Sequence, residues 1–240
     1  MEKGLVYLVP TVLDEQGTNV IPVYIADAVK NAQVFFAENE RTARRFLKQF
    51  WRERMPAGEE IVIDHYEWFT IHKAEEEVRE AFTQKLKEGK NIAIISEAGC
   101  PGVADPGQLL VAVAQEMNAK VVPLVGPSSI LLALMASGMN GQQFRFLGYL
   151  PIDLQERIKA IRELEADSKK NNCTEIFIET PYRNNQLLET ILKHATPSSR
   201  LCIAVDLTGE KEWIKTKTVS EWRKEKVDIH KRPAIFLLMA

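Results

Sequence analysis

Short apolar runs alternate with amphipathic stretches along the first half of the chain. The runs carry no polar alternation and read as strands at residues 4–10, 33–38, 60–68, 91–96 and 120–126. Apolar side chains recur at helical spacing between them, at residues 20–32, 39–54, 74–90 and 106–119, where Pro106 can occupy a first helical turn. Continuous apolar strands that alternate with helices predict a mostly parallel sheet covered on both faces.

The same alternation restarts in the second half. Strands are expected at residues 143–150, 174–180, 200–208 and 232–240, and helices at 127–139, 154–170 and 184–195. Residues 206–222 look more like a hairpin and turn, because Gly209 and a Thr-Lys alternation interrupt them. We therefore expect an α/β protein of two α/β domains, residues 1–123 and 124–240, the second with a mixed sheet.

Composition narrows the class of protein without identifying it. The formal net charge of −2 gives no global basic field that would indicate a nucleic-acid partner, although a local basic patch is compatible with it. Three widely spaced cysteines without a CxxC pair argue against a disulfide framework and a zinc site, and the four histidines are scattered. No apolar run approaches the ~20 residues of a membrane span, and the N-terminus does not resemble a signal peptide, so a cytoplasmic protein is expected.

Four loops at expected strand ends are candidate sites, and each has an ordinary structural alternative. The segment Ser96–Gly107, "SEAGCPGVADPG", combines three glycines with two prolines, which suits either an elaborate turn or a rigid backbone that a ligand approaches closely. The segment "GPSS" opens an expected helix. Its serines suit an ordinary N-cap, and the free amides of the first turn suit the binding of a polar ligand group. Glu179 and Arg183 in "ETPYR" fit a surface ion pair, as do Glu40 and Arg44 in "ENERTARR". No standard dinucleotide or triphosphate loop occurs.

The order of these motifs resembles that of the tetrapyrrole methylase family of S-adenosylmethionine (SAM) dependent methyltransferases. "SEAGCPGVADPG" matches a family loop of the form SDAGTPxxSDPG, and "VGPSS", "FRFLGYLP", "ETPYR" and "DLTGEKEW" follow in the family order. The pattern is most similar to the branch that methylates a cytidine ribose 2'-hydroxyl of small-subunit ribosomal RNA. The resemblance implies two α/β domains with the SAM cleft between them and a homodimer. Methyl transfer from a sulfonium requires no metal, so none is expected.

Position by position, the resemblance also implies which residues contact SAM. They are Val9, Pro10, Gly99, Cys100, Pro101, Val103, Ser129, Ile130, Thr180, Ala204, Pro233 and Ala234. Cys100 stands where many relatives have Asp or Thr, and we interpret it as a small residue facing the ligand rather than as a nucleophile.

Methyl transfer from a sulfonium depends mainly on alignment, and a general base adds about 10²–10⁴-fold for a hydroxyl acceptor. Glu38 and Glu40 are the candidate bases, and Arg41 is a candidate for holding a substrate phosphate. RNA or the small ribosomal subunit is the expected substrate. Two alternatives stay open: methylation of a tetrapyrrole or another small molecule, and a SAM-binding module without catalysis.

Overall fold

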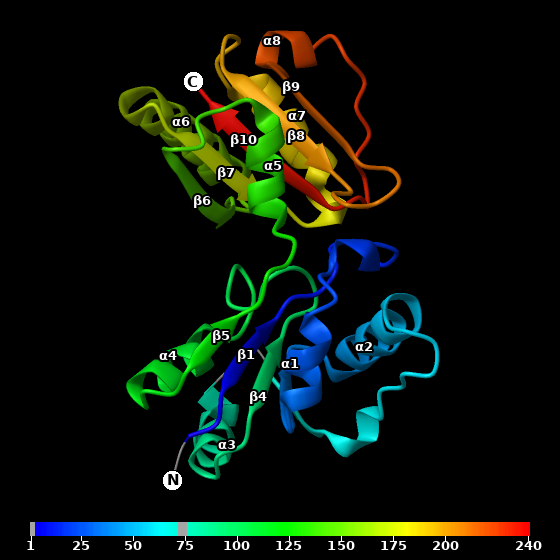
Figure 1. Cartoon of the computed structure of the whole chain (residues 1–240). Coiled ribbons are helices and arrows are strands. Elements are labelled where there is room, and N and C mark those ends of the chain that lie inside the picture. Colours follow the sequence, from blue (N-terminus) through cyan, green and yellow to red (C-terminus); the bar gives the residue numbers. More distant parts are fainter. Residues whose placement is uncertain (1–2, 72–75) are drawn as a thin grey trace. The chain divides into compact units, whose positions relative to one another are not determined.

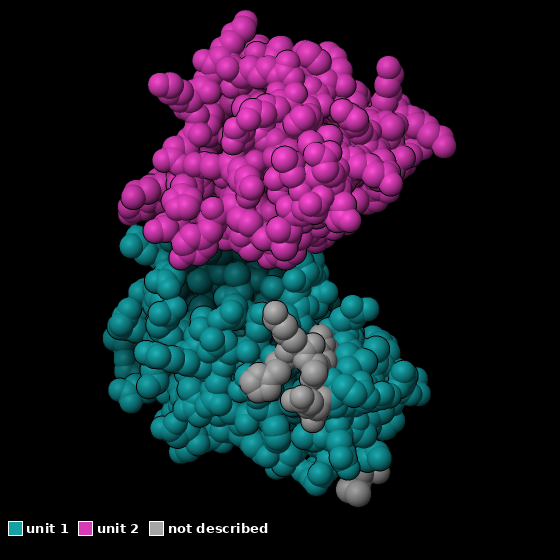
Figure 2. Space-filling view, turned by 180° about the vertical axis from the view of Figure 1, so that it is seen from behind, with its two compact units in different colours: residues 1–128 teal, residues 129–240 magenta. Residues whose placement is uncertain are grey.

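The computed structural model describes residues 3–71 and 76–240, and it divides into two compact units, residues 1–128 and 129–240 (Figure 2). The expected boundary, near residues 123–126, lies just before this division. His72 and the first two residues of the helix expected at 74–90 lie outside the described residues. Each unit is described by itself below.

Unit 1 contains a five-stranded sheet in which every strand pairing is parallel (Figure 1). Its strand order is β3-β2-β4-β1-β5. The strands are β1 (Val6–Val9), β2 (Val34–Ala37), β3 (Glu67–Thr70), β4 (Ile92–Ile95) and β5 (Val121–Pro123). The helices are α1 (Ile25–Asn31), α2 (Glu40–Arg54), α3 (Glu76–Lys87) and α4 (Gln108–Glu116), with 3₁₀ turns at Thr18–Val20 and Ile63–His65.

Both faces of this sheet are buried, which is why its strands carry continuous apolar runs. Phe35 belongs to a core with residues of α1 and α2, whereas its neighbour Phe36 belongs to a second core with residues of α3 and α4. Because successive strand side chains point to opposite faces, one run must be apolar at every position to fill two cores. The expected parallel, doubly covered sheet is confirmed.

Two local expectations in unit 1 were wrong. Residues 60–68 do not form one strand, because Ile63–His65 makes a 3₁₀ turn with Val62 half exposed before it, and β3 begins only at Glu67. Pro106 does not lie in the first turn of α4, since Gly107 precedes the helix with a φ of 122° that no helical residue adopts.

Unit 2 contains a mixed sheet of order β6-β7-β10-β8-β9, in which only the β6–β7 pairing is parallel. The expected mixed sheet is therefore confirmed. The strands are β6 (Phe144–Tyr149), β7 (Thr174–Ile178), β8 (Arg200–Val205), β9 (Trp213–Thr218) and β10 (Ala234–Met239). The helices are α5 (Ser129–Ser137), α6 (Leu154–Asn171), α7 (Asn184–His194) and α8 (Val219–Trp222), with a 3₁₀ turn at Pro181–Arg183.

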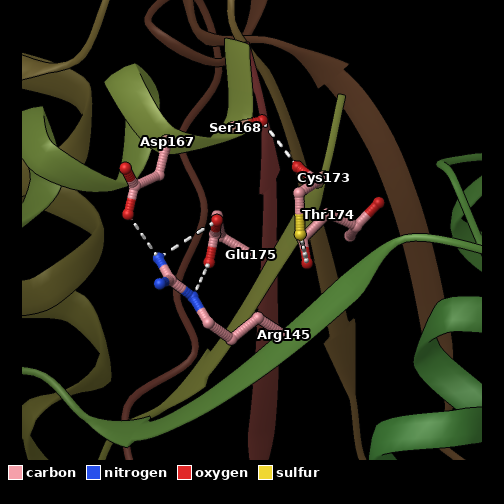
Figure 3. Close-up of polar contacts among 6 residues, drawn as sticks. All are labelled: Arg145, Asp167, Ser168, Cys173, Thr174 and Glu175. Carbon is pink, nitrogen blue, oxygen red and sulfur yellow. Dashed lines mark hydrogen bonds and ion pairs between the residues drawn. The ribbon is translucent and has the colours of Figure 1, made fainter. Parts of the chain in front are cut away.

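Helices α6 and α7 bury their apolar sides against Phe177, Phe236 and their neighbours, and α5 packs against β8, β9 and β10, lying in front of β10 in Figure 1. On the α6 side, an ion pair between a half-exposed arginine and a buried glutamate joins the two parallel strands (Figure 3). Arg145 of β6 donates to both oxygens of Glu175 of β7, at 3.0 and 3.2 Å, and to Asp167 of α6 at 2.9 Å. The Glu175 side chain is 1% exposed.

Candidate functional site: the carboxyl ends of the unit 1 strands

The strands at the centre of unit 1 end at the same level. Val9 of β1 and Ala37 of β2 both pair with Ile95 of β4, and Leu8 pairs with Pro123 of β5. The segments that follow these residues therefore leave one edge of the sheet together. In open parallel sheets this carboxyl edge is where ligands bind.

The glycines of Ser96–Gly107 hold backbone conformations that few other residues adopt. Gly99 and Gly107 have φ values of 75° and 122°. A Cβ on Gly99 would lie 3.3 Å from Leu13 Cδ2, and one on Gly107 would lie 3.1 Å from Ile94 Cγ2. Gly99 O also accepts a hydrogen bond from Thr11 N at 2.8 Å, so the loop pairs with the segment that follows β1. Its shape is thus fixed by backbone geometry and close packing together.

The segment that follows β5 packs against the segment that follows β1 and against the Ser96–Gly107 loop. A Cβ on Gly126 would lie 2.1 Å from Pro10 Cβ, so only glycine permits the contact between the two segments. The Cys100 thiol lies 3.5 Å from Pro127 O. Burial, together with the charge of Asp105, raises the pKa of Cys100, so the thiol stays protonated at neutral pH. A neutral thiol favours the interpretation of Cys100 as a ligand neighbour rather than a nucleophile.

Three carboxyl groups gather at the same edge. Glu38, the residue after β2, accepts a hydrogen bond from Glu97 N at 2.9 Å, and Thr42 Oγ1 donates to Glu97 Oε1 at 3.2 Å. We call Glu38, Glu97 and Asp105 the carboxylate cluster. None of the three forms an ion pair with another residue in the described ranges.

Burial and nearby negative charge raise the pKa of two members of this cluster, Glu38 and Asp105. Burial is the main cause that raises the pKa of Glu38, and the nearby Glu97 charge adds to it. For Asp105, burial followed by the charges of Glu38 and Glu97 raises the pKa to about 6. A carboxyl group that titrates near neutral pH, in a group of like charges at a strand edge, is typical of a functional site.

The other two candidate catalytic residues lie in the first turn of α2 and differ in their contacts. Glu40 Oε1 is 2.8 Å from Arg44 Nε, and Arg44 also contacts Asp64 at 2.8 Å. Glu40 thus forms the i,i+4 surface pair that the spacing allows. Arg41 is exposed and makes no ion pair with any described residue.

Residues expected to contact SAM also gather within unit 2. Ala204 pairs with Ile235, Ala234 pairs with Val205, and Ile178, two residues before Thr180, pairs with Ile235 as well. This register brings Thr180, Ala204, Pro233 and Ala234 to one end of β7, β10 and β8. The far end of α5 lies toward the opposite end of the sheet, since Arg200, the first residue of β8, donates from Nη1 to Gly138 O at 3.2 Å. Helix α5 therefore starts, at Ser129 and Ile130, near the end of the sheet that carries the other expected SAM contacts of unit 2.

The pair of Glu179 and Arg183 is not the surface pair that the sequence allowed. The Glu179 side chain is fully buried, and its Oε1 accepts from Arg183 Nη2 at 2.7 Å and from Thr180 N at 2.6 Å. The turn that carries Thr180 is therefore fixed by a buried, charge-assisted hydrogen-bond network.

The two sets of expected SAM contacts lie in different units. Unit 1 brings Val9, Pro10, Gly99, Cys100, Pro101 and Val103 to one strand edge, and unit 2 gathers the other six. The chemistry of the unit 1 edge fits SAM, because SAM carries a sulfonium and an ammonium that suit nearby carboxylates. Exposed Val103 offers an apolar contact beside the glycine backbone. These assignments stay predictions.

Sequence reasoning missed two members of the carboxylate cluster. Glu97 and Asp105 both stand in the Ser96–Gly107 segment, but only their approach to Glu38, which follows the neighbouring strand β2, distinguishes them from turn residues. Over residues 3–71 and 76–240, no group of three or more His, Cys, Asp or Glu could hold a metal ion, and no helix has the length and apolarity to cross a membrane.

Comparison with known proteins identifies the class to which this fold and strand edge belong. The family model described as "Tetrapyrrole (Corrin/Porphyrin) Methylases" matches residues 18–222. The crystal structure of the methyltransferase CobJ superposes with a TM-score of 0.62 over 100% of this chain and 94% of its own, at 14% identity. Uroporphyrin-III C-methyltransferase from Thermus thermophilus complexed with S-adenosylhomocysteine gives a TM-score of 0.53 over 98% and 97% of the two chains, at 16% identity. The chain belongs to the tetrapyrrole methylase family and is a SAM-dependent methyltransferase.

Among curated relatives, the similarity is to proteins named "Ribosomal RNA small subunit methyltransferase I". The protein of that name from Buchnera aphidicola subsp. Schizaphis graminum is 29% identical over 98% of this chain and 78% of its own length. The one from Escherichia coli O157:H7 is 36% identical over 65% of this chain and 55% of its own length. The match to the second relative thus spans little more than half of that protein.

Proposed function

We propose that this methyltransferase methylates a ribose 2'-hydroxyl of small-subunit ribosomal RNA. The names of the relatives support the RNA substrate. The observation that carries the choice of a hydroxyl acceptor is the carboxylate cluster, because a hydroxyl must lose its proton when it is methylated. Glu38 lies at the strand edge with a raised pKa, beside an Asp105 whose pKa is about 6.

In this proposal SAM supplies an activated methyl group when bound, and the chain's own residues position the acceptor and take its proton. Glu38 Oε2 is held by the Glu97 amide, which fixes the carboxylate at the strand edge. The ribose oxygen forms a bond to the methyl carbon as the carbon–sulfur bond breaks, and the hydroxyl proton passes to Glu38. A base with a pKa raised toward the working pH is the efficient choice for this transfer.

The roles of the other candidate residues are part of the same proposal. Arg41, exposed and without an ion pair to any described residue, holds a phosphate of the substrate. Glu40 is engaged with Arg44 and is the weaker of the two candidate bases. The SAM contacts are those that the family resemblance implies, in two sets. They are Val9, Pro10, Gly99, Cys100, Pro101 and Val103 in unit 1, and Ser129, Ile130, Thr180, Ala204, Pro233 and Ala234 in unit 2. We also expect a homodimer in the cytoplasm, and light scattering on a sizing column measures that oligomeric state.

The test is transfer of a labelled methyl group from SAM to small ribosomal subunits that lack their methylations. We expect label in the RNA, and in 2'-O-methylated nucleosides after digestion. Label on a base instead of a ribose would contradict the proposed acceptor. Label on a tetrapyrrole and on no RNA would favour the small-molecule alternative over the RNA substrate.

A further inference from the structure

The solvent face of α2 carries a row of basic side chains. All four are exposed and follow one another at i, i+4, i+7 and i+11: Arg41, Arg45, Lys48 and Arg52. This spacing keeps them on one side of the helix, while Phe46, Leu47 and Phe50 on the other side are buried in the unit 1 core. At 1.5 Å per residue, the row extends for about 16 Å. We call these four residues the basic row.

The charge of α2 contrasts with that of the whole chain. The helix holds six basic and two acidic residues, a net charge of +4, in a protein whose net charge is −2. The rest of the chain is therefore net −6. Such a local excess of positive charge in an acidic protein attracts a polyanion to one place on the surface.

Much of this charge is available to a partner. Arg41 and Lys48 form no ion pair with any described residue. Arg45 pairs with Glu15 at 2.8 Å and Arg52 with Glu53 at 2.9 Å, but the Arg45, Glu15 and Arg52 side chains are mostly exposed. Exposed pairs of this kind contribute little stability and can be exchanged for phosphate contacts.

The row also lines one wall of a groove. Gln49 Nε2 donates to Glu15 O at 2.9 Å, which holds the segment at Glu15 and Gln16 alongside the helix. The groove between this segment and α2 is lined by Arg41, Arg45, Lys48 and Arg52, together with Arg44 and Gln49. Its walls are polar and mostly basic, so it suits an extended anion better than an apolar ligand.

The position of the row relates it to the carboxylate cluster. Helix α2 begins two residues after Glu38, and Arg41 lies in its first turn. From there the row leads away from the strand edge of unit 1. If the ribose of a nucleotide lies at Glu38, the next phosphates of the RNA backbone would lie within reach of successive side chains of the basic row.

We propose that the basic row of α2 binds the sugar–phosphate backbone of the RNA substrate next to the methylated nucleotide. This inference rests on the proposed function, which makes the substrate an RNA. The row would supply affinity and register through phosphate contacts, and the identity of the target nucleotide would be read elsewhere.

The test is a triple variant, Arg45→Gln, Lys48→Gln and Arg52→Gln, which leaves the candidate catalytic residue Arg41 in place. Glutamine keeps a good helix former at exposed positions, so the fold is retained. The probe is small-subunit ribosomal RNA transcribed in vitro, which is unmethylated. Each neutralised phosphate adds ~0.7 to the slope of log K against log salt, so the triple variant should make this slope shallower by about 2. At ~0.1 M salt this corresponds to affinity weaker on the order of 100-fold.

The control variant carries the same loss of charge on α6, as Lys159→Gln, Arg162→Gln and Lys169→Gln. All three residues are exposed, on a helix with five basic and four acidic residues. We expect the control to bind RNA like the wild type. In methyl transfer, the α2 variant should raise KM for RNA, with kcat and SAM affinity changed little.

Two results would overturn the inference. Equal RNA affinity and salt dependence in the α2 variant and the wild type would mean that the basic row faces another partner, such as an acidic protein surface. Equal weakening by both variants would mean that binding depends on net charge and not on this row. Failure of the proposed function looks different, because the wild type itself would then transfer no methyl group to RNA.

Discussion

Two groups of acidic side chains in this molecule are held in opposite ways. In unit 2, the buried Glu175 carboxylate receives two hydrogen bonds from Arg145, so its charge has a partner of the opposite sign (Figure 3). In unit 1, Glu38, Glu97 and Asp105 come together without an ion pair to any described side chain, and the pKa of Asp105 rises to about 6. Glu175 lies within a strand and the three unit 1 carboxylates lie in segments after strands, yet only Glu175 has its charge neutralised within the described chain.

The difference separates a structural role from a functional one. A buried carboxylate with a fixed cation is part of the architecture, and removing the cation is what costs stability. A cluster of like charges costs stability in the folded protein, and such clusters persist where chemistry uses them. The contrast therefore predicts that unit 1 carboxylates affect turnover and that the unit 2 pair affects unfolding.

The largest effect expected from breaking this contrast is on catalysis. Glu38→Gln removes the proposed base while keeping a side chain of the same shape, so turnover should fall by about 10²-fold or more. SAM affinity, measured by calorimetry, should stay within a few-fold of the wild type. Glu40→Gln is the matched comparison and should lose much less, because Glu40 is paired with Arg44. Unchanged turnover in Glu38→Gln would contradict its assignment as the base.

The next effect is on the stability of unit 2. Arg145→Ala leaves the Glu175 carboxylate without its partner, which should cost about 2 kcal/mol in the free energy of unfolding, since Arg145 itself is half exposed. Urea unfolding followed by tryptophan fluorescence measures this change, since Trp213 and Trp222 lie in unit 2. As a control, Lys159→Ala breaks only the exposed 3.8 Å pair with Glu163 and should cost under about 0.5 kcal/mol. An equal loss of unfolding free energy in the two variants would mean that the Arg145–Glu175 pair contributes no more to stability than an exposed surface pair.

The smallest effect is a gain in stability at the carboxylate cluster. The pKa of Asp105 is higher in the folded protein than in the unfolded chain, so its contribution to stability is lost as the pH rises from about 4 to about 6. Asp105→Asn removes a charge that folding disfavours. We expect the variant to be about 1 kcal/mol more stable than the wild type at pH 7.5. This is less than the full pKa shift implies, because Asp105 is partly exposed and solvent screens its charge.

At pH 4 the two proteins should have the same stability, because Asp105 is then mostly protonated in the folded wild type. Denaturant unfolding at both pH values measures the difference. A loss of stability in Asp105→Asn at pH 7.5 would mean that the carboxylate is stabilised by its surroundings, as Glu175 is.

Much of the fold could be predicted from local pattern, because a sheet buried on both faces needs runs such as Phe35-Phe36 that are apolar at every position. The strand expected at residues 60–68 was wrong, because an apolar run does not reveal that Ile63–His65 turns instead of pairing. The site was predictable only where one segment carries the signal, as in the glycines of Ser96–Gly107. Asp105 was missed because its role depends on the neighbouring positions of β2 and β4 in the sheet, which local sequence does not encode.

Calorimetric titration of SAM into Gly99→Val tests most directly the claim that the carboxyl edge of unit 1 holds the cofactor. A Cβ at Gly99 would crowd Leu13 and Pro127 O, whereas Gly58 has a similar positive φ of 93° with open space around it. Gly58→Val is therefore a control for backbone strain alone, and circular dichroism verifies that both variants fold. We expect that folded Gly99→Val no longer binds SAM while Gly58→Val binds it like the wild type. Wild-type affinity in Gly99→Val would contradict a cofactor site at this edge.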